Sequence, residues 1–204
     1  MGIRRLTLPR ATIQCKTYRV ELLGKIYQII DTPGLDDSPR TNLTVLKSIA
    51  AEVSRISKQA QTIGGVVYFH KITNLRLTGS DRSNIEVFEQ ICGRPFLHRS
   101  VFATTMWDTV SSADHRKFSQ LHTSLENMYS HLVEKGTKFL KFEGNTISAT
   151  AVLQSLAKSA TKPAPRLQLE NEVIKTGLSA SSVRKTSAGK VIVKQMNRGS
   201  CVIL

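Results

Sequence analysis

Short apolar runs alternate along this chain with longer stretches in which apolar residues recur at helical spacing. The segments 64–70 ("GGVVYFH"), 100–105 ("SVFATT") and 138–142 ("KFLKF") have the character of strands in the interior of a sheet. Helical patterns cover residues 41–58, a stretch through Ile85 that stops at Gly93, about 114–134, and 146–158. This alternation predicts an α/β fold in three layers, with a mostly parallel sheet between helices.

A β-hairpin is predicted before these elements. Residues 17–23 ("TYRVELL") and 25–31 ("KIYQIID") alternate apolar and polar side chains around Gly24. The candidate functional segments 31–37, 70–80 and 105–108 all follow predicted strands. Because ligands of parallel sheets bind beyond the carboxyl ends of the strands, we expect these segments to share one site.

The first of these segments opens with Asp31-Thr32-Pro33-Gly34. A carboxylate at a strand end can hold a water molecule of a Mg²⁺ shell. Gly34 would let backbone N–H groups approach a terminal phosphate. This is how a P-loop GTPase leaves a buried strand, and "LDDSPR" (35–40) would be its nucleotide-sensing switch. The alternative is an ordinary turn between a strand and a helix.

A second acidic residue, Asp108, follows the run 100–105. Its carboxylate is placed to accept two hydrogen bonds from the edge of a guanine, an arrangement that rejects adenine. The alternatives are that Asp108 caps a helix start and that Trp107 only anchors the loop.

The segments 11–38, 64–80 and 101–108, in this order, resemble the septin-related, immune-associated (GIMAP-type) GTPases, most closely the fungal G-domain proteins of that kind. The resemblance covers about residues 10–158. It implies a Ras-like P-loop NTPase fold, binding of GTP or GDP with Mg²⁺, GTP hydrolysis, and a homodimer through the G domain.

Site residues carried over from this resemblance are of three kinds. Thr12 would ligate Mg²⁺ in the GTP state, and Asp31 would hold a water of the same ion. The nucleotide would also contact Thr32, Pro33, Gly34 and the base-specificity residue Asp108. Thr105 and Gly144-Asn145 would lie close to the base.

Two departures from the family pattern limit this expectation. Thr105-Met106 stands where the family has Asn-Lys, and the 204 residues contain no phosphate loop of the form G-x-x-x-x-G-K-[ST]. We therefore expect a fold truncated at the N-terminus, without the central strand between 25–31 and 64–70. Such a chain would bind nucleotide weakly and hydrolyse little or no GTP, because it lacks the amides and the lysine that hold the phosphates.

The charge and the last residues predict a membrane partner. A net charge of +14 favours a polyanion. Cys201-Val202-Ile203-Leu204 fits a C-a-a-X geranylgeranylation signal on Cys201, and the chain just before it is basic. The expected parts are an incomplete G domain (1–159), a linker with a short helix (160–177) and a flexible basic tail (178–204). The protein would lie on the cytosolic face of a membrane.

Two other functions fit the same sequence. A pseudo-GTPase would use the switch surfaces to recruit partners without turnover. A basic nucleic-acid-binding protein would fit the charge, but the chain has no recognisable motif of that class, so nucleic acid is not the expected partner. Among the histidines, His70 at a strand end would face the nucleotide, and His98, His115, His122 and His131 would lie on the surface.

Overall fold

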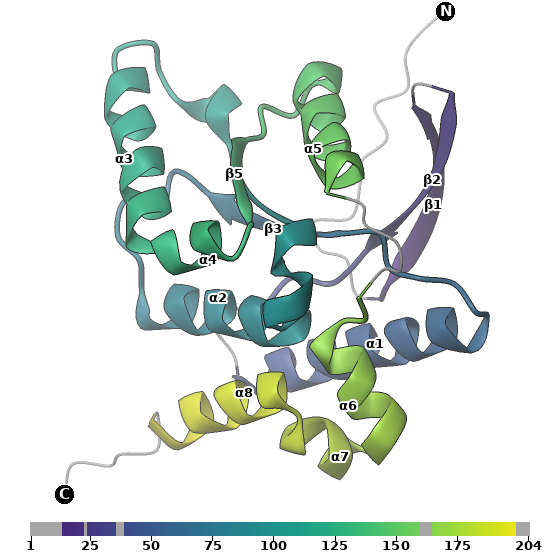
Figure 1. Cartoon of the computed structure of the whole chain (residues 1–204). Coiled ribbons are helices and arrows are strands. Elements are labelled where there is room, and N and C mark those ends of the chain that lie inside the picture. The colour runs from purple at the N-terminus through teal and green to yellow at the C-terminus, as the bar shows by residue number, and fades with distance from the viewer. Residues whose placement is uncertain (1–13, 23, 36–38, 160–164, 199–204) are drawn as a thin grey trace, which may run out of the picture.

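The computed structural model describes residues 14–22, 24–35, 39–159 and 165–198 (Figure 1). Thr12, Asp36, Asp37 and Cys201 lie outside these ranges. In chain order, the elements are β1 (Lys16–Leu22), β2 (Lys25–Asp31), α1 (Pro39–Lys58), β3 (Val66–Lys71), α2 (Gly79–Cys92), β4 (Ser100–Thr105), α3 (His115–Met128), α4 (Ser130–Glu134), β5 (Lys138–Lys141), α5 (Thr146–Lys158), α6 (Gln168–Thr176), α7 (Ala180–Lys185) and α8 (Ser187–Arg198).

The central sheet has the strand order β3-β4-β5, and both strand pairs are parallel. Phe102 of β4 stacks on Phe139 of β5, with ring centroids 4.6 Å apart, and shares a cluster with Phe88 of α2. Val101 and Ala103, the residues on either side of Phe102 in β4, point to the opposite face of the sheet and pack with Val152 of α5. The predicted α/β fold with a parallel sheet is therefore confirmed.

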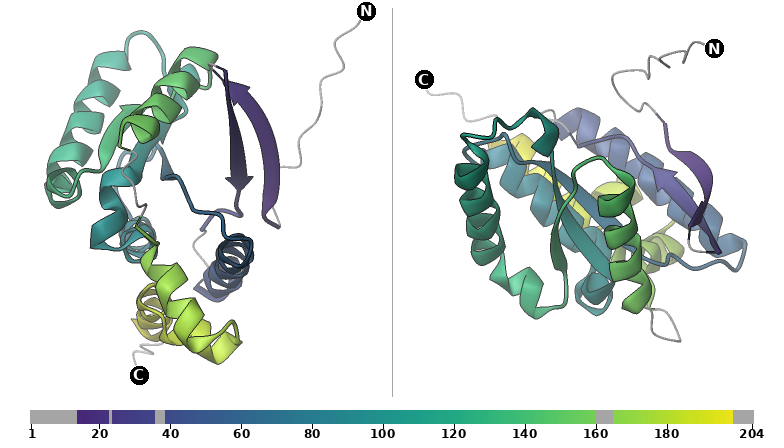
Figure 2. Two further views of the ribbon diagram at one scale, coloured as in Figure 1. Left: turned by 45° about the vertical axis from the view of Figure 1, so that its right-hand side comes forward. Right: turned by 90° about the horizontal axis from the view of Figure 1, so that it is seen from above.

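The hairpin forms a sheet of its own. β1 and β2 pair antiparallel from Lys16 opposite Asp31 to Leu22 opposite Lys25. Figure 2 shows this hairpin beside the three-stranded sheet, and among the described residues no backbone ladder joins the two. A hydrogen bond from Thr17 Oγ1 to Glu52 Oε1 of α1, 3.4 Å long, links the hairpin to the body of the molecule.

The predicted helix over 114–134 is two helices, α3 and α4, which break at Tyr129. Tyr129 has φ −107° and ψ 31°, outside the helical range. Its ring lies parallel to Phe102 of the sheet, with centroids 6.3 Å apart. The helix therefore breaks at the residue that contacts the core. The helical pattern of the sequence does not reveal this contact.

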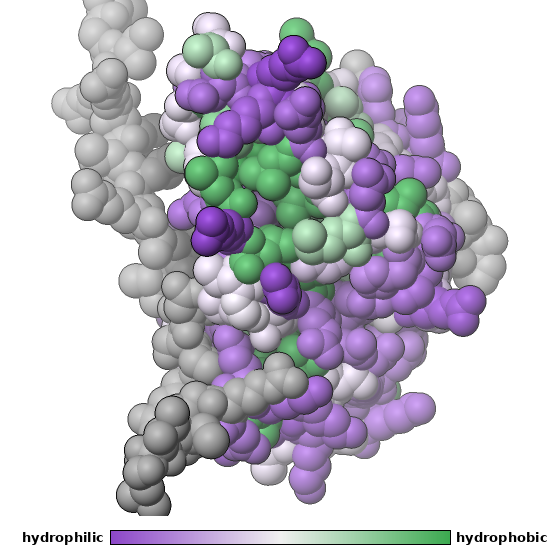
Figure 3. Space-filling model, turned by 90° about the vertical axis from the view of Figure 1, so that its left-hand side faces the viewer, coloured by the Kyte–Doolittle hydropathy of each residue, from purple (hydrophilic) through white to green (hydrophobic). Residues whose placement is uncertain are grey.

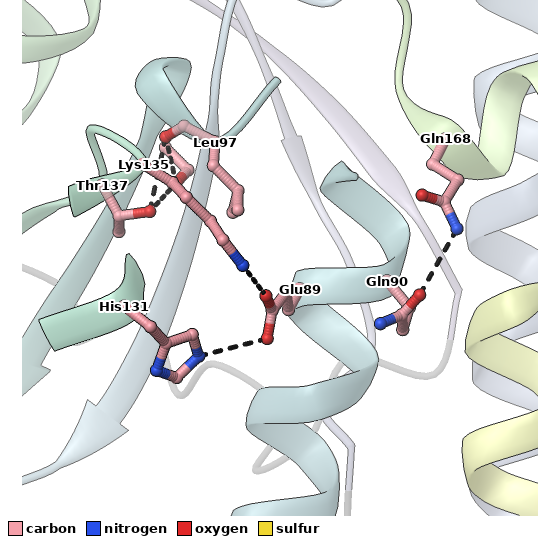
Figure 4. Close-up of polar contacts among 8 residues, drawn as sticks. Glu89, Gln90, Leu97, His131, Lys135, Thr137 and Gln168 are labelled. Atoms are coloured by element: carbon pink, nitrogen blue, oxygen red, sulfur yellow. Dashed lines mark hydrogen bonds and ion pairs between the residues drawn. The ribbon is translucent and has the colours of Figure 1, made fainter. Parts of the chain in front are cut away.

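Polar contacts join α2 to the elements on both of its sides (Figure 4). Glu89 accepts hydrogen bonds from Lys135 Nζ (2.7 Å) and from His131 Nε2 near the start of α4 (3.3 Å). On the other side, Gln168 Nε2 of α6 donates to Gln90 Oε1 at 3.3 Å. These contacts are partly exposed, so they orient the helices more than they stabilise them.

The segment expected to be a flexible tail contains α7 and α8, which the structure places against α1 and α2 (Figure 1). Val183, Ala188 and Ile192 are buried in one cluster with Leu46 of α1 and Val87 of α2. The interpretation of residues 180–198 as flexible was wrong. Their few apolar residues lie on the inner faces of short helices, so a basic composition concealed an amphipathic pattern. The boundaries of the predicted parts stay predictions.

The outer surface differs between two sides of the molecule. On the side away from the hairpin, hydrophilic residues surround a limited hydrophobic patch (Figure 3). On the strands, by contrast, Ile26 of β2 is 56% exposed and Phe69 of β3 is 53% exposed. No helix in the described ranges is long and apolar enough to cross a membrane.

Candidate functional site

The loops after β3, β4 and β5 are held together by backbone hydrogen bonds just beyond the strand ends. Ile72 N donates to Thr105 O at 3.1 Å, and Phe142 N donates to Thr104 O at 2.8 Å. The segments that start at residues 72, 106 and 142 therefore leave the sheet side by side. This is the edge at which parallel sheets bind ligands.

The loop after β4 is anchored by Trp107, which is only 5% exposed. Its indole Nε1 donates to Thr104 O at 3.0 Å and to Thr104 Oγ1 at 3.1 Å. Lys141 Nζ lies 4.6 Å from the centroid of the indole ring, within the range of a cation–π contact. Trp107 is thus an anchor of this loop, the role that the sequence analysis names for it.

On this anchor the loop presents Met106 and Asp108 to solvent. Met106 has φ +67°, a left-handed conformation that is uncommon for a residue other than glycine. Thr109 Oγ1 donates to Met106 O at 2.8 Å and closes the turn. Asp108 lies in the short 3-10 helix Trp107–Thr109, and the residue at the start of α3 is Asp114, so Asp108 is not the cap of that helix.

The structure also describes Thr105, Gly144 and Asn145, which the sequence analysis places close to the base. Thr105 Oγ1 donates to His70 O across the β3–β4 ladder at 3.3 Å. Gly144 is exposed with φ +74°, which favours glycine, and nothing lies within 4 Å of where its Cβ would be. Asn145 Oδ1 accepts from Ser148 N at 2.8 Å, so this side chain caps α5. The contact of Asn145 with a base stays a prediction.

Asp31, Thr32, Pro33 and Gly34 follow β2, in the other sheet. Asp31 is exposed and lies opposite Lys16 in the ladder, whereas Pro33 is buried. An alanine Cβ at Gly34 would meet nothing within 4 Å, so the backbone there is open to approach. No group of three His, Cys, Asp or Glu residues in the described ranges is arranged to hold a metal ion.

His70 and His122 are both buried. His70 is 3% exposed, its Nε2 has no hydrogen-bond partner, and its ring lies 5.8 Å from that of Phe102, so the side chain belongs to the core. The expectation that His122 lies on the surface was wrong: its Nδ1 is 3.0 Å from Thr104 Oγ1. Burial, with the charge of Lys141 as a smaller cause, lowers the pKa of His122.

His122 is the residue of this region that sequence reasoning missed. It lies four residues after Phe118 and three before Leu125, which is buried, so helical spacing places it on the inner face of α3. A histidine on such a face is neutral when buried, because burial disfavours the charged imidazole. The contact of His122 Nδ1 with Thr104 Oγ1 helps to hold Thr104, and Thr104 in turn holds Trp107 and the loop after β4.

Comparisons with known proteins agree with the fold. No protein-family model and no curated protein sequence matches the chain. Among solved structures, the chain is similar to a dimerisation-deficient mutant of Toc33 from Arabidopsis thaliana, with a TM-score of 0.55 and 14% sequence identity. The match covers 76% of this chain and 72% of Toc33. At this identity the match shows a shared fold.

Proposed function

We propose that the chain is a guanine-nucleotide-binding G domain of the septin-related group, with a three-layer Ras-like fold. The observation that carries this proposal is the loop after β4. A buried, doubly hydrogen-bonded Trp107 holds an exposed Asp108 at the ligand-binding edge of a parallel sheet. The shared fold with Toc33 supports the same interpretation.

In this proposal Asp108 accepts two hydrogen bonds from the guanine edge, and Met106 packs on the base through its thioether. Asp31, Thr32, Pro33 and Gly34 approach the terminal phosphate. One exposed carboxylate fits a Mg²⁺ ion that is held mainly by phosphate oxygens, the common arrangement for this ion. Thr12 would be its second protein ligand, and the ion would neutralise charge on the phosphates.

The 204 residues contain no phosphate loop, so we propose weak binding and little or no hydrolysis by this chain. The backbone amides and the lysine that normally hold the β- and γ-phosphate oxygens have no counterpart in its sequence pattern. The affinity that remains would come from the base contacts and from Asp31 with Mg²⁺.

The test is titration of the full chain with a fluorescent GTP analogue in the presence of Mg²⁺, with competition by GTP and by ATP. We expect saturable binding that GTP reverses and ATP does not. Asp108→Asn should raise Kd by on the order of tenfold or more, because charge-assisted hydrogen bonds contribute about 1.5–3 kcal/mol each. Glu134→Gln, which neutralises an exposed carboxylate on α4, should leave Kd unchanged.

No saturable binding by a chain that circular dichroism shows to be folded would contradict this function. It would favour the second candidate, a pseudo-GTPase that recruits partners without nucleotide turnover. Equal competition by GTP and ATP would contradict only the assignment of Asp108 to the guanine edge. Sedimentation of the same sample would test the homodimer that the family resemblance implies.

We further propose that the protein is tethered to the cytosolic face of a membrane through Cys201. The sequence supports this with the C-a-a-X terminus and with Arg184, Lys185, Lys190 and Lys194 before it. The prenylated chain should sediment with anionic liposomes and should be released by salt when the lipid is absent. Cys201→Ser should lose stable retention. Stronger retention on RNA than on liposomes would instead favour a nucleic-acid partner.

A further inference from the structure

A pocket of about 420 Å³ lies between α1 and α7, within the size range of small-molecule sites. Figure 1 shows α7 at the end of the molecule opposite to the loop between β5 and α5. The pocket is therefore separate from the loops after β4 and β5 in the candidate site. Its lining side chains come from one face of each helix: Leu43, Thr44, Lys47, Ala180, Val183 and Arg184.

Helical spacing explains how these side chains reach the same pocket. Leu43 and Lys47 are four residues apart on α1, and Ala180 and Arg184 are four residues apart on α7. Residues at this spacing lie one turn apart on the same face of a helix. Each helix thus supplies one apolar side chain and, a turn later, one cation to the pocket.

The floor of the pocket is apolar. Val183 is only 2% exposed and belongs to the cluster that also contains Leu46 of α1. Leu43 is half-buried and packs against this cluster, and Ala180 is exposed beside it. Apolar surface that stays open to water in a concave site favours an apolar part of a ligand.

The polar part of the pocket is positively charged. Lys47 and Arg184 are exposed, and neither forms an ion pair with another residue in the described ranges. None of the six lining residues is acidic, and residues 178–204 contain no Asp or Glu. The carboxylate of α1, on Glu52, is already bound by Arg55 at 2.7 Å. An anion in the pocket would be attracted by both cations.

We propose that this pocket binds a single-chain anionic amphiphile of the fatty-acid class. Its carboxylate would accept hydrogen bonds from Lys47 and Arg184, and the chain next to it would cover Leu43, Ala180 and Val183. One alkyl chain fits because only three apolar side chains line the pocket, so a second chain would stay in water. The proposal uses neither the proposed nucleotide site nor Cys201, so it stands whether or not those proposals hold.

The probe for the test is octanoate, which is soluble as a monomer. Amide chemical shifts of the full chain are followed by NMR during the titration. We expect saturable shifts centred on residues 43–47 and 180–184. 1-Octanol has the chain without the charge, and acetate has the charge without the chain. Each should bind with a Kd higher by on the order of tenfold or more, because each makes only one kind of contact.

Four variants make the test specific. Lys47→Gln and Arg184→Gln should each raise the Kd for octanoate by about two- to fivefold, the range of a partly exposed ion pair. Lys190→Gln removes an exposed cation of α8 that does not line the pocket and should leave Kd unchanged. Ala180→Glu places a carboxylate one turn before Arg184, where it competes with the ligand, and should abolish saturable binding.

These substitutions are all at exposed positions, so the NMR spectrum of each variant should remain that of the folded parent. Four results would overturn the inference. The first is no saturable shift with octanoate, and the second is a shift centred outside α1 and α7. The third is equal affinity for 1-octanol or acetate. The fourth is an acidic peptide that shifts the same amides when octanoate does not, because the pocket would then recognise a protein segment.

Discussion

Thr104 and Trp107 form a short double contact at the end of β4: one indole N–H donates to both the carbonyl and the hydroxyl oxygen of the threonine, at 3.0 and 3.1 Å. The hydroxyl is also 3.0 Å from His122 Nδ1. The indole can only donate, so the hydroxyl accepts from Trp107, and its own hydrogen has two acceptors within reach, His122 Nδ1 and Leu140 O at 3.5 Å. Together Thr104, Trp107 and His122 fix the loop that presents Asp108.

Replacing Thr104 with valine keeps the shape of the side chain but removes the hydroxyl. We expect the free energy of unfolding to fall by about 1–3 kcal/mol, because His122 Nδ1 is left buried without a partner. Urea denaturation measures this change. Thr123→Val on the exposed side of α3 removes a hydroxyl that bonds only to Ser119 O and should cost less than about 0.5 kcal/mol. Equal losses in the two variants would contradict the network.

Stability should depend on pH through His70. Burial lowers the pKa of His70 below its usual 6.5, and the carboxylate of Asp81 opposes this only partly. Below about pH 6.5 the unfolded chain binds a proton that the folded chain resists, so folding stability falls as the pH falls. The contribution of His70 is thus complete above that pH and is lost on acidification toward the folded-state pKa.

The variant His70→Leu tests this dependence. It removes a buried Nε2 that has no hydrogen-bond partner, so it should lose less stability than the parent between about pH 7.5 and pH 5. Urea denaturation at a series of pH values gives both slopes. Part of the decrease in unfolding free energy with falling pH should remain in the variant, because burial also lowers the pKa of His122. Identical slopes in parent and variant would show that His70 is not the group that titrates.

The C-terminal helices should be part of the cooperatively folded unit. Ile192 of α8 is fully buried against α1 and α2, so Ile192→Ala should cost about 2–5 kcal/mol of unfolding free energy. Ile174→Ala on α6, where the side chain is 52% exposed, should cost less than about 1 kcal/mol. If α8 were an independent tail, both variants would unfold like the parent.

Gly189 allows α8 to lie close to α7. A Cβ at this position would clash with Val183 O and with the backbone of Arg184. Gly189→Ala should therefore lower the free energy of unfolding by about 1–3 kcal/mol, since the backbone must move to relieve the contact. Gly64→Ala, where the added Cβ meets nothing within 4 Å, is the control. Thermal unfolding of the two variants compares them directly, and equal midpoints would contradict the close packing.

The sequence by itself determined most of the local structure. Strands at 25–31 and 100–105 and the helix at 146–158 lie where apolar spacing predicted them, because period-two and helical patterns are properties of short segments. The parallel sheet followed from the order of these segments, and the sequence analysis named an anchoring role for Trp107.

Only the tertiary structure decided the rest. The burial of His122, the break at Tyr129 and the packing of α7 and α8 all depend on residues far away in the sequence, such as Thr104, Phe102 and Leu46. The pocket between α1 and α7 likewise depends on two helices that are distant in the sequence. Hydrophobic periodicity shows which face of an element is apolar, but the partner that covers this face is set by packing across the whole chain.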